Sequence, residues 1–249
     1  MKPFVIDSDA QIGIGETWGS PPRWVDYKVE ALLGRSAEAG IDRSCVMAPR
    51  NPLYDLTNKQ VAKVCEKYSE RLIGFAVHKP QREAGQLRQL LIAEVKSLGL
   101  KGVRSDGHPT RELLDVVAEL NVPVVYYPDL QEYPGPAQAY YMIATAYPSV
   151  KFILPHLGAY RSWQWWAHYE AIDLVKRFPN VYVGTSSVIS RKYLEMAARE
   201  LPADRILFGS FAPELDPRVE IFSVKLLHLP NQQEALVLGG NIQRLFANS

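Results

Sequence analysis

The chain alternates short apolar runs with longer segments of helical periodicity. The apolar runs occupy residues 4–8, 44–48, 72–77, 102–104, 122–127, 151–154, 181–184 and 205–208. A run such as Pro123-Val124-Val125-Tyr126 has no alternation of polar and apolar positions, which is typical of a parallel strand buried on both faces. The eight runs, each followed by a helical stretch, predict eight repeated βα units.

Leu, Val and Ala recur at helical spacing between these runs, most clearly over residues 58–68, 83–97, 111–120 and 192–200. Thr57 and Thr110 stand where an N-cap would begin a helix, and Gly40 and Gly99 where a left-handed residue would end one. Two stretches rich in Gly or Pro, 13–23 and 128–136, interrupt the alternation and are expected to be loops. We therefore predict an α/β fold, a single (β/α)8 TIM barrel over residues 1–249, with its site at the C-terminal ends of the strands.

Composition agrees with a globular barrel that binds a small molecule. The chain has 249 residues, 47% hydrophobic and 22% charged, and a net charge of +1 with Lys and Arg scattered along it. This pattern gives no electrostatic footprint for nucleic acid or for an anionic membrane surface. A small-molecule substrate is therefore the expected partner.

The cysteines and the N-terminus favour a cytoplasmic protein. Cys45 and Cys65 are too few to act as a disulfide scaffold in a chain of this size, and we expect both to be buried thiols in a reducing compartment. The first residues contain no signal-peptide core, and no window approaches ~18 uninterrupted apolar residues. The tryptophans that follow residue 156 could pack a helix onto the barrel or form a subunit interface, so a homodimer is a further possibility.

Several segments together resemble the amidohydrolase-2 family, which includes decarboxylases of aromatic or muconate-type acids and lactone hydrolases. The start, Val5-Ile6-Asp7-Ser8-Asp9-Ala10-Gln11, is similar to the family's first-strand motif, Ile-Asp-x-His-x-His. Residues 51–58 with 71–76, 101–104, 152–158 with 180–183, 205–213 and 238–246 resemble later strands and the C-terminal helix. The resemblance runs in order along nearly the whole chain and implies the same barrel fold.

The chain departs from the family at the metal-binding positions. The resemblance implies a divalent metal, typically zinc, bound by two residues of the first strand, a His ending the fifth and an Asp ending the eighth. These positions hold Asp9, Gln11, Tyr127 and Phe211 here. Zinc needs roughly three or four N, S or O donors, and this set offers one carboxylate. We therefore expect no metal and no other cofactor.

His156 matches the sixth-strand histidine, which the resemblance implies handles protons or polarises substrate. An imidazole titrates near neutral pH and can give and take a proton in one cycle. Asp9 could orient His156 or act as the base, and Tyr127 could replace the metal as hydrogen-bond donor to a developing oxyanion. The alternative for His156 is a core histidine held beneath a loop, and Asp9 could equally cap a loop or pair with an arginine.

Further polar residues stand at the ends of other predicted strands. Arg104 could clamp a substrate carboxylate through its planar guanidinium, or it could form an internal salt bridge with Asp106. His78 could line the pocket or face solvent, and Ser186 could donate a hydrogen bond to substrate. His156 and Arg104 are expected to face one cavity, with Asp9, Tyr127 and Phe211 around its floor, since strand ends converge on one mouth. Gln11 and Asp106 are further candidates for substrate binding.

Three hypotheses for function follow. The first is a metal-independent enzyme that uses His156 for hydrolysis, or for a lyase or isomerase step, on a small anionic molecule such as a lactone, an amide or an aromatic or unsaturated carboxylic acid. The second is a catalytically silent barrel that binds a ligand or a partner. The third is a zinc hydrolase with an improvised site made of Asp9, His156, Asp106 and His78.

Overall fold

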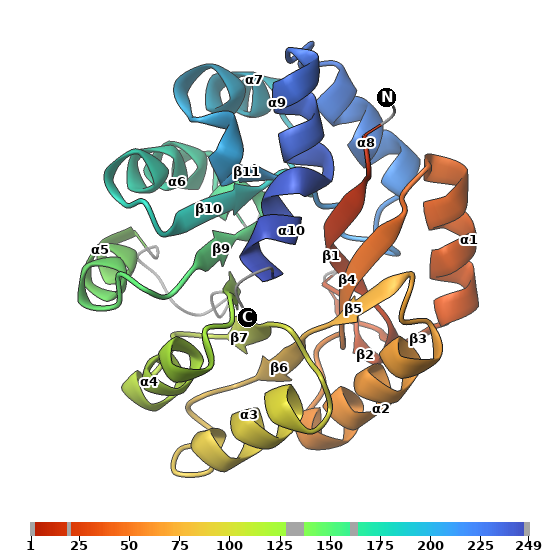
Figure 1. Ribbon diagram of the computed structural model, residues 1–249, viewed down its shortest axis with the longest axis vertical. Helices are drawn as coiled ribbons and strands as arrows, with labels where there is room; N and C mark the ends of the chain where they lie inside the picture. The colour runs from red at the N-terminus through yellow and green to blue at the C-terminus, as the bar shows by residue number, and fades with distance from the viewer. Residues whose placement is uncertain (1–2, 19–20, 128–136, 160–163, 247–249) are drawn as a thin grey trace.

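The computed structural model describes residues 3–18, 21–127, 137–159 and 164–246 of the chain. Its parallel strands surround one axis and its helices form an outer ring (Figure 1). In chain order the barrel strands are β1 (Ile6–Gln11), β4 (Arg43–Met47), β5 (Leu72–Gly74), β6 (Ala76–His78), β7 (Val103–Asp106), β8 (Val124–Tyr127), β9 (Phe152–Leu154), β10 (Val181–Gly184) and β11 (Ile206–Leu207). The predicted (β/α)8 barrel is confirmed.

The barrel closes through two backbone connections. β5 and β6 form one barrel strand interrupted at Phe75, whose N–H donates to the Val46 carbonyl on β4, while the Ala76 N–H donates to the Gly102 carbonyl before β7. The segment after β11 closes on β1, because the Gln11 N–H donates to the Ala212 carbonyl at 2.7 Å. The nine short strands therefore make eight staves, as the eight apolar runs predict.

The helices form the layer outside the barrel strands. They are α1 (Val29–Ala39), α2 (Tyr54–Lys67), α3 (Leu87–Lys96), α4 (Arg111–Leu120), α5 (Ala137–Ala146), α6 (Trp165–Arg177), α7 (Arg191–Glu200), α8 (Pro217–Lys225), α9 (Asn231–Ala235) and α10 (Asn241–Phe246). On α4, for example, Leu113, Leu114, Val116, Val117 and Leu120 are buried and form one face at helical spacing. Within the described ranges, none of these helices is both long enough and apolar enough to cross a membrane.

Two of the predicted helix ends are confirmed. The Thr110 hydroxyl accepts from the Leu113 N–H and caps α4, and Gly40 ends α1 with φ of 75°. Thr57 is not a cap, because α2 begins three residues earlier and the Thr57 hydroxyl donates to the Tyr54 carbonyl. Gly99 has φ of 72°, but α3 already ends at Lys96.

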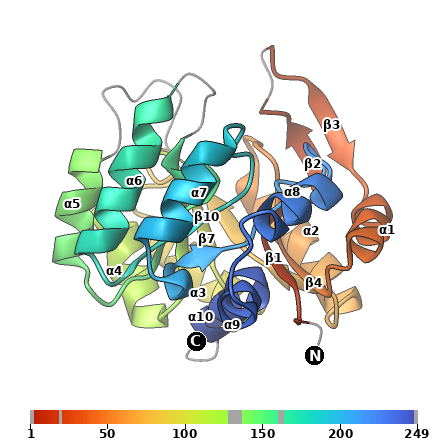
Figure 2. The ribbon, with the colours of Figure 1, turned by 90° about the horizontal axis from the view of Figure 1, so that it is seen from above.

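The predicted loop over residues 13–23 contains a strand instead. Residues 13–16 form β2 (Gly13–Glu16), which pairs antiparallel with β3 (Trp24–Tyr27). The close approach of this hairpin to the chain after β4 requires Gly15, since a Cβ there would lie 2.4 Å from the Arg50 carbonyl oxygen. Figure 2 shows the hairpin at one end of the barrel and α10 with both termini at the other. The other expected loop, 128–136, lies outside the described residues.

Candidate active site

Asp9 is the centre of a hydrogen-bonded group inside the C-terminal end of the barrel. It lies on β1, and its carboxylate is buried. The Tyr127 hydroxyl, at the end of β8, donates to Asp9 Oδ1 at 2.8 Å, and the Ser186 hydroxyl, just beyond β10, donates to Asp9 Oδ2 at 2.7 Å. Burying a carboxylate is costly, and the hydrogen bonds from these two hydroxyls offset that cost.

His156 joins this group through Ser186. Its Nδ1 lies 2.9 Å from Ser186 Oγ, 3.1 Å from the Ser186 carbonyl oxygen and 3.9 Å from Asp9 Oδ2. Because the Ser186 hydroxyl gives its proton to Asp9, the hydrogen-bond network assigns the imidazole proton to Nδ1. Nε2 is then the nitrogen that can accept a proton, and the Asp9 charge can stabilise the imidazolium that results.

Burial lowers the pKa of His156 below its ordinary value of 6.5, although the Asp9 charge and the Ser186 carbonyl oppose the shift. The imidazole is therefore neutral at pH 7. A lowered pKa also makes the imidazolium a stronger acid, which favours delivery of its proton to a weakly basic atom.

The turns that present these residues adopt left-handed backbone conformations. His156 and Leu157 follow β9 with φ of 57° and 49°, Ser187 follows β10 with φ of 56°, and Phe211 follows β11 with φ of 55°. Such values cost roughly 1–2 kcal/mol for a residue with a Cβ and persist only where surrounding contacts enforce them. Glu220 of α8 supplies one such contact by accepting from the Ser187 N–H at 3.0 Å. Burial raises the pKa of Glu220 to about 7.

Asp7 forms a structural layer beneath Asp9. It is fully buried and accepts hydrogen bonds from the Ser210 N–H at 2.8 Å, the Ser210 hydroxyl and the Asp9 N–H at 3.0 Å. Burial raises the pKa of Asp7 to about 7, against the opposing effect of these hydrogen bonds. Because these hydrogen bonds occupy both oxygens of the Asp7 carboxylate, Asp7 serves to connect β1 to the segment after β11.

Arg104 is held by an internal salt bridge rather than presented as an open clamp. On β7, its Nε lies 2.9 Å from Asp106 Oδ1 and its Nη2 donates to Asp106 Oδ2 at 3.1 Å. The Tyr54 hydroxyl also donates to Asp106, and burial together with the Asp106 charge raises the pKa of Tyr54, so the phenol stays protonated. The guanidinium is fully buried, with its carbon 5.1 Å from the Tyr127 ring centroid.

His78 is placed away from the Asp9 group. Its imidazole is fully buried, with Nε2 2.7 Å from Glu94 on α3 and Nδ1 3.0 Å from Glu83. Asn58 of α2 donates to the other Glu94 oxygen at 2.8 Å. Burial lowers the pKa of His78, but the two glutamates outweigh it and raise the pKa to about 9. His78 was expected either to line the pocket or to face solvent, and the structure shows instead a buried imidazolium that joins β6 to the helical layer.

Three further residues cover the Asp9 group. The Phe211 ring lies edge-on to His156, with centroids 4.6 Å apart. The Trp18 ring, beyond β2, lies 5.0 Å from the Tyr127 ring and 6.3 Å from the Phe211 ring. Gln11 is fully buried, and within the described part of the chain neither polar atom of its amide has a hydrogen-bond partner. An unpaired buried amide costs about 1–3 kcal/mol, so Gln11 is a candidate to bind a ligand.

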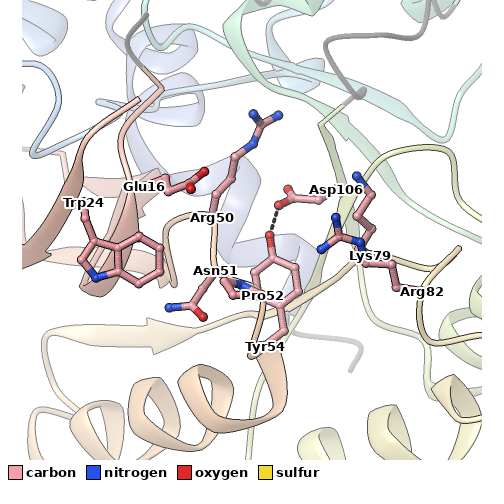
Figure 3. A pocket seen from close by; sticks show the side chains of 9 residues that line it. All are labelled: Glu16, Trp24, Arg50, Asn51, Pro52, Tyr54, Lys79, Arg82 and Asp106. Atoms are coloured by element: carbon pink, nitrogen blue, oxygen red, sulfur yellow. Dashed lines mark hydrogen bonds between the residues drawn. The ribbon is translucent and has the colours of Figure 1, made fainter. Parts of the chain in front are cut away.

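A cavity of about 390 Å³ lies on the side of β4, β6 and β7. Its lining residues are Glu16, Trp24, Arg50, Asn51, Pro52, Tyr54, Lys79, Arg82 and Asp106. Its Arg50 stacks on Trp18, which in turn contacts Tyr127 of the Asp9 group. Figure 3 shows the bonded pair of Tyr54 and Asp106 between Arg50 on one side and Lys79 and Arg82 on the other. Of these residues, only Asp106 was a candidate from the sequence. Arg50 and Lys79 could have been found from their positions just after β4 and β6.

Fold and site together define a (β/α)8 barrel with its polar groups gathered at the C-terminal strand ends. The family model of amidohydrolase-2, described as amidohydrolase, matches residues 20–247. The chain therefore belongs to the amidohydrolase-2 family. A search of curated proteins gave no match.

Solved structures with a similar fold include decarboxylases. One is 5-carboxyvanillate decarboxylase from Sphingomonas paucimobilis, with 15% identity, a TM-score of 0.77 and 99% of each chain covered. Another is 2,6-dihydroxybenzoate decarboxylase from Rhizobium, with 19% identity, a TM-score of 0.75 and 99% of each chain covered. A third, dihydroxybenzoic acid decarboxylase from Polaromonas sp. JS666 with bound manganese and an inhibitor, has 19% identity, a TM-score of 0.75 and 99% of this chain and 97% of that chain covered. At these identities the likeness shows the fold.

The residues at the barrel centre do not fit the metal that the family implies. Tyr127 uses its hydroxyl proton on Asp9, Phe211 offers no donor atom, and Gln11 offers only a weak amide ligand. The improvised set does not gather either, because Asp106 is paired with Arg104 and His78 with two glutamates. Over the ranges that the structure describes, no three His, Cys, Asp or Glu side chains are placed to hold a metal ion.

Proposed function

We propose that the protein is a metal-independent lyase that removes a carboxyl group from a small aromatic or unsaturated acid. The observation that carries the proposal is the hydrogen-bonded group of Tyr127, Asp9, Ser186 and His156 beside a cavity rich in cations. The decarboxylases with the same fold support the choice of reaction class. The sequence-based hypothesis of hydrolysis is kept as the competing outcome of the test.

The step requires one proton to be moved. His156 Nε2 accepts the proton of the carboxylic acid and delivers it to the carbon that carries the carboxyl group. The C–C bond then breaks, CO2 leaves, and the new C–H bond replaces the lost one, so atoms and charge balance. The Asp9 carboxylate, 3.9 Å from Nδ1, stabilises the transient imidazolium.

The surrounding side chains bind and orient the acid. The Gln11 amide, which has no hydrogen-bond partner among the described residues, supplies a donor and an acceptor at the end of β1. The Tyr127 hydroxyl donates its one proton to Asp9 Oδ1, so it orients that carboxylate rather than donating to the substrate oxygen. Trp18 and Phe211 exclude water and give the aromatic ring an apolar surface.

The test compares matched histidine variants. Protein treated with chelator is screened against hydroxybenzoic acids, unsaturated diacids, lactones and amides, with CO2 release and deuterium uptake from D2O as readouts. His156→Asn should lower kcat by at least ~10²-fold, because asparagine tolerates the left-handed backbone but cannot transfer the proton. His228→Asn is the control, since His228 has a similar φ of 50° and lies beyond α8.

Three results would reject this function. Ester or amide cleavage without CO2 release would assign a hydrolase. Binding of acids with no turnover of any kind would assign the silent barrel. Activity that disappears with chelator and returns with manganese would reject metal independence.

A further inference from the structure

We infer that a groove between α2 and α3 binds a phosphorylated small molecule of the nucleoside phosphate type, at the end of the barrel opposite the Asp9 group. The groove has a volume of about 630 Å³, which is within the usual range for a small-molecule site. Binding there would use neither Asp9 nor His156 and so is independent of the proposed function.

The groove lies where helices return to strands, which is the N-terminal end of the barrel. α2 and α3 are neighbours in the outer ring (Figure 1). Among the lining residues, Arg43 begins β4, Leu72 begins β5 and Lys101 precedes β7. Figure 2 shows α10, which contributes Phe246, at the end of the barrel away from the β2–β3 hairpin. The groove is therefore separate from the strand ends that form the candidate active site.

The described lining of this groove carries an excess of positive charge. Its cations are Arg43, Lys59, Lys63, Lys96 and Lys101. Asp55, outside the lining, pairs with Lys59 at 2.8 Å. Among the residues that the structure describes, no carboxylate lies within salt-bridge distance of the other four cations, and Glu66 is the one acid in the lining. Four cations against one acid leave a surplus of three positive charges, although the net charge of the whole chain is only +1.

The interior of the groove adds no negative charge to offset this surplus. Cys65 contributes its thiol from α2, and burial raises the pKa of that thiol to about 12, so it stays protonated at pH 7. Gly74 of β5 packs against it, since a Cβ at Gly74 would lie 3.1 Å from the Cys65 sulfur. Lys63, Lys96 and Lys101 are all exposed. The groove therefore has a neutral interior and a positive rim.

The segment that carries two of the lysines is anchored to the barrel and presents apolar surface beside them. The Lys101 N–H donates to the Gly74 carbonyl at 2.8 Å, and the Leu98 N–H donates to the Ala93 carbonyl at 3.1 Å. Leu98 is nevertheless 37% exposed, and together with Ile73 it lines the groove next to the cations. Binding groups on anchored backbone lose less conformational entropy when a ligand binds. A ring placed here would be removed from water beside the lysines.

The kind of cation favours phosphate over a carboxylate. Three of the four cations without a carboxylate partner are lysines, whose ammonium groups act as point charges with three donors each. The planar pairing with two parallel hydrogen bonds that suits a carboxylate is the preference of arginine. A surplus of three positive charges suits a diphosphate or triphosphate, and the apolar side chains suit the base of a nucleoside.

Calorimetric titration with ATP, tripolyphosphate and adenosine, without divalent metal and at about 0.15 M ionic strength, tests the inference. ATP should bind with a Kd below about 1 mM, and each of the other two probes at least about 5-fold more weakly, because each has only one of the two recognised parts. The double variant Lys96→Ala with Lys101→Ala should weaken ATP binding about 10-fold, since it removes two charged contacts. Leu98→Ser should weaken ATP binding about 3-fold and leave tripolyphosphate binding unchanged.

Lys225→Ala is the matched control. Lys225, like Lys96, is an exposed lysine in the last turn of a helix, and it lies on α8 outside the described lining of the groove. Its loss should leave the affinity for ATP unchanged, and far-UV circular dichroism checks that every variant is folded. A Kd for ATP above about 1 mM, an equal loss of affinity in Lys225→Ala, or equal affinity for ATP and tripolyphosphate would overturn the inference. The titration needs no turnover, so none of these results bears on the proposed lyase.

Discussion

Breaking the buried pair of Arg104 and Asp106 should cost far more stability than breaking a pair on the surface. Asp106→Asn leaves the Arg104 guanidinium, which is 0% exposed, without an opposing charge. Removing one partner of such a pair typically costs about 3–5 kcal/mol in the free energy of unfolding. Arg104→Met should cost a similar amount, because within the described part of the chain it leaves the Asp106 carboxylate with the Tyr54 hydroxyl as its one remaining side-chain partner.

The double variant separates the free energy of the Arg104–Asp106 pairing from the other effects of the two substitutions. With Arg104 already replaced, Asp106→Asn removes an uncompensated charge and should cost little. The two single losses should then exceed the double loss by at least about 2 kcal/mol. Urea unfolding followed by circular dichroism and Trp fluorescence measures the free energies, provided that both signals give one transition.

Lys59 and Asp55 on α2 provide the matched control. Their side chains are 58% and 54% exposed and lie 2.8 Å apart. Lys59→Met and Asp55→Asn should show a coupling of less than about 1 kcal/mol. Single losses below about 1 kcal/mol at Arg104 and Asp106, or strictly additive losses, would refute the internal pair and restore the interpretation of Arg104 as a substrate clamp.

Three further predictions follow from the same structure. Protein purified without added metal should contain well under one equivalent of zinc, manganese or iron by elemental analysis; a stoichiometric, chelator-sensitive metal would contradict the donor set at the barrel centre. His78 has a pKa of about 9 in the fold and about 6.5 unfolded, so its stabilisation of about 3 kcal/mol is complete below pH 6.5 and is lost as pH rises through 9. Unfolding curves of His78→Gln should lack this loss, and parallel pH profiles for wild type and variant would disprove it. By NMR, the His156 imidazole should titrate below 6.5, and Asp9→Asn should move it lower still because the Asp9 charge raises that pKa; an upward movement would exclude the assigned contact.

The barrel was predictable because its strands have apolar interiors. The polar residues at the strand ends were harder to assign. The first strand, predicted over residues 4–8, continues to Gln11, because Asp9 and Gln11 point into the barrel interior, where a sequence pattern expects apolar side chains. The β2–β3 hairpin was missed because its Gly residues and flanking Pro residues are typical of a loop. In both places, contacts with distant residues decide the local structure.

The site residues were partly predictable for a similar reason. Four of them stand at or just beyond the ends of recognisable strands, namely His156, Asp9, Tyr127 and Ser186. The barrel topology brings such strand ends together. The contact between His78 and Glu94 was not predictable, because Glu94 lies 16 residues away on a helix. Nor does any motif unite the cations of the cavity, which come from two loops, one after β4 and one after β6, and meet only in the folded chain.

The β2–β3 hairpin concentrates control of ligand choice in one short insertion. It contributes Glu16 and Trp24 to the cavity and fixes the backbone of Arg50, and the loop that joins its strands carries Trp18. None of these residues belongs to the barrel staves. Changes in some fifteen residues could therefore alter which acids are accepted while the Asp9 group and the staves stay intact. For protein engineering this makes the hairpin a replaceable cassette, and exchange of residues 13–27 between relatives is a direct route to new substrate ranges on an unchanged scaffold.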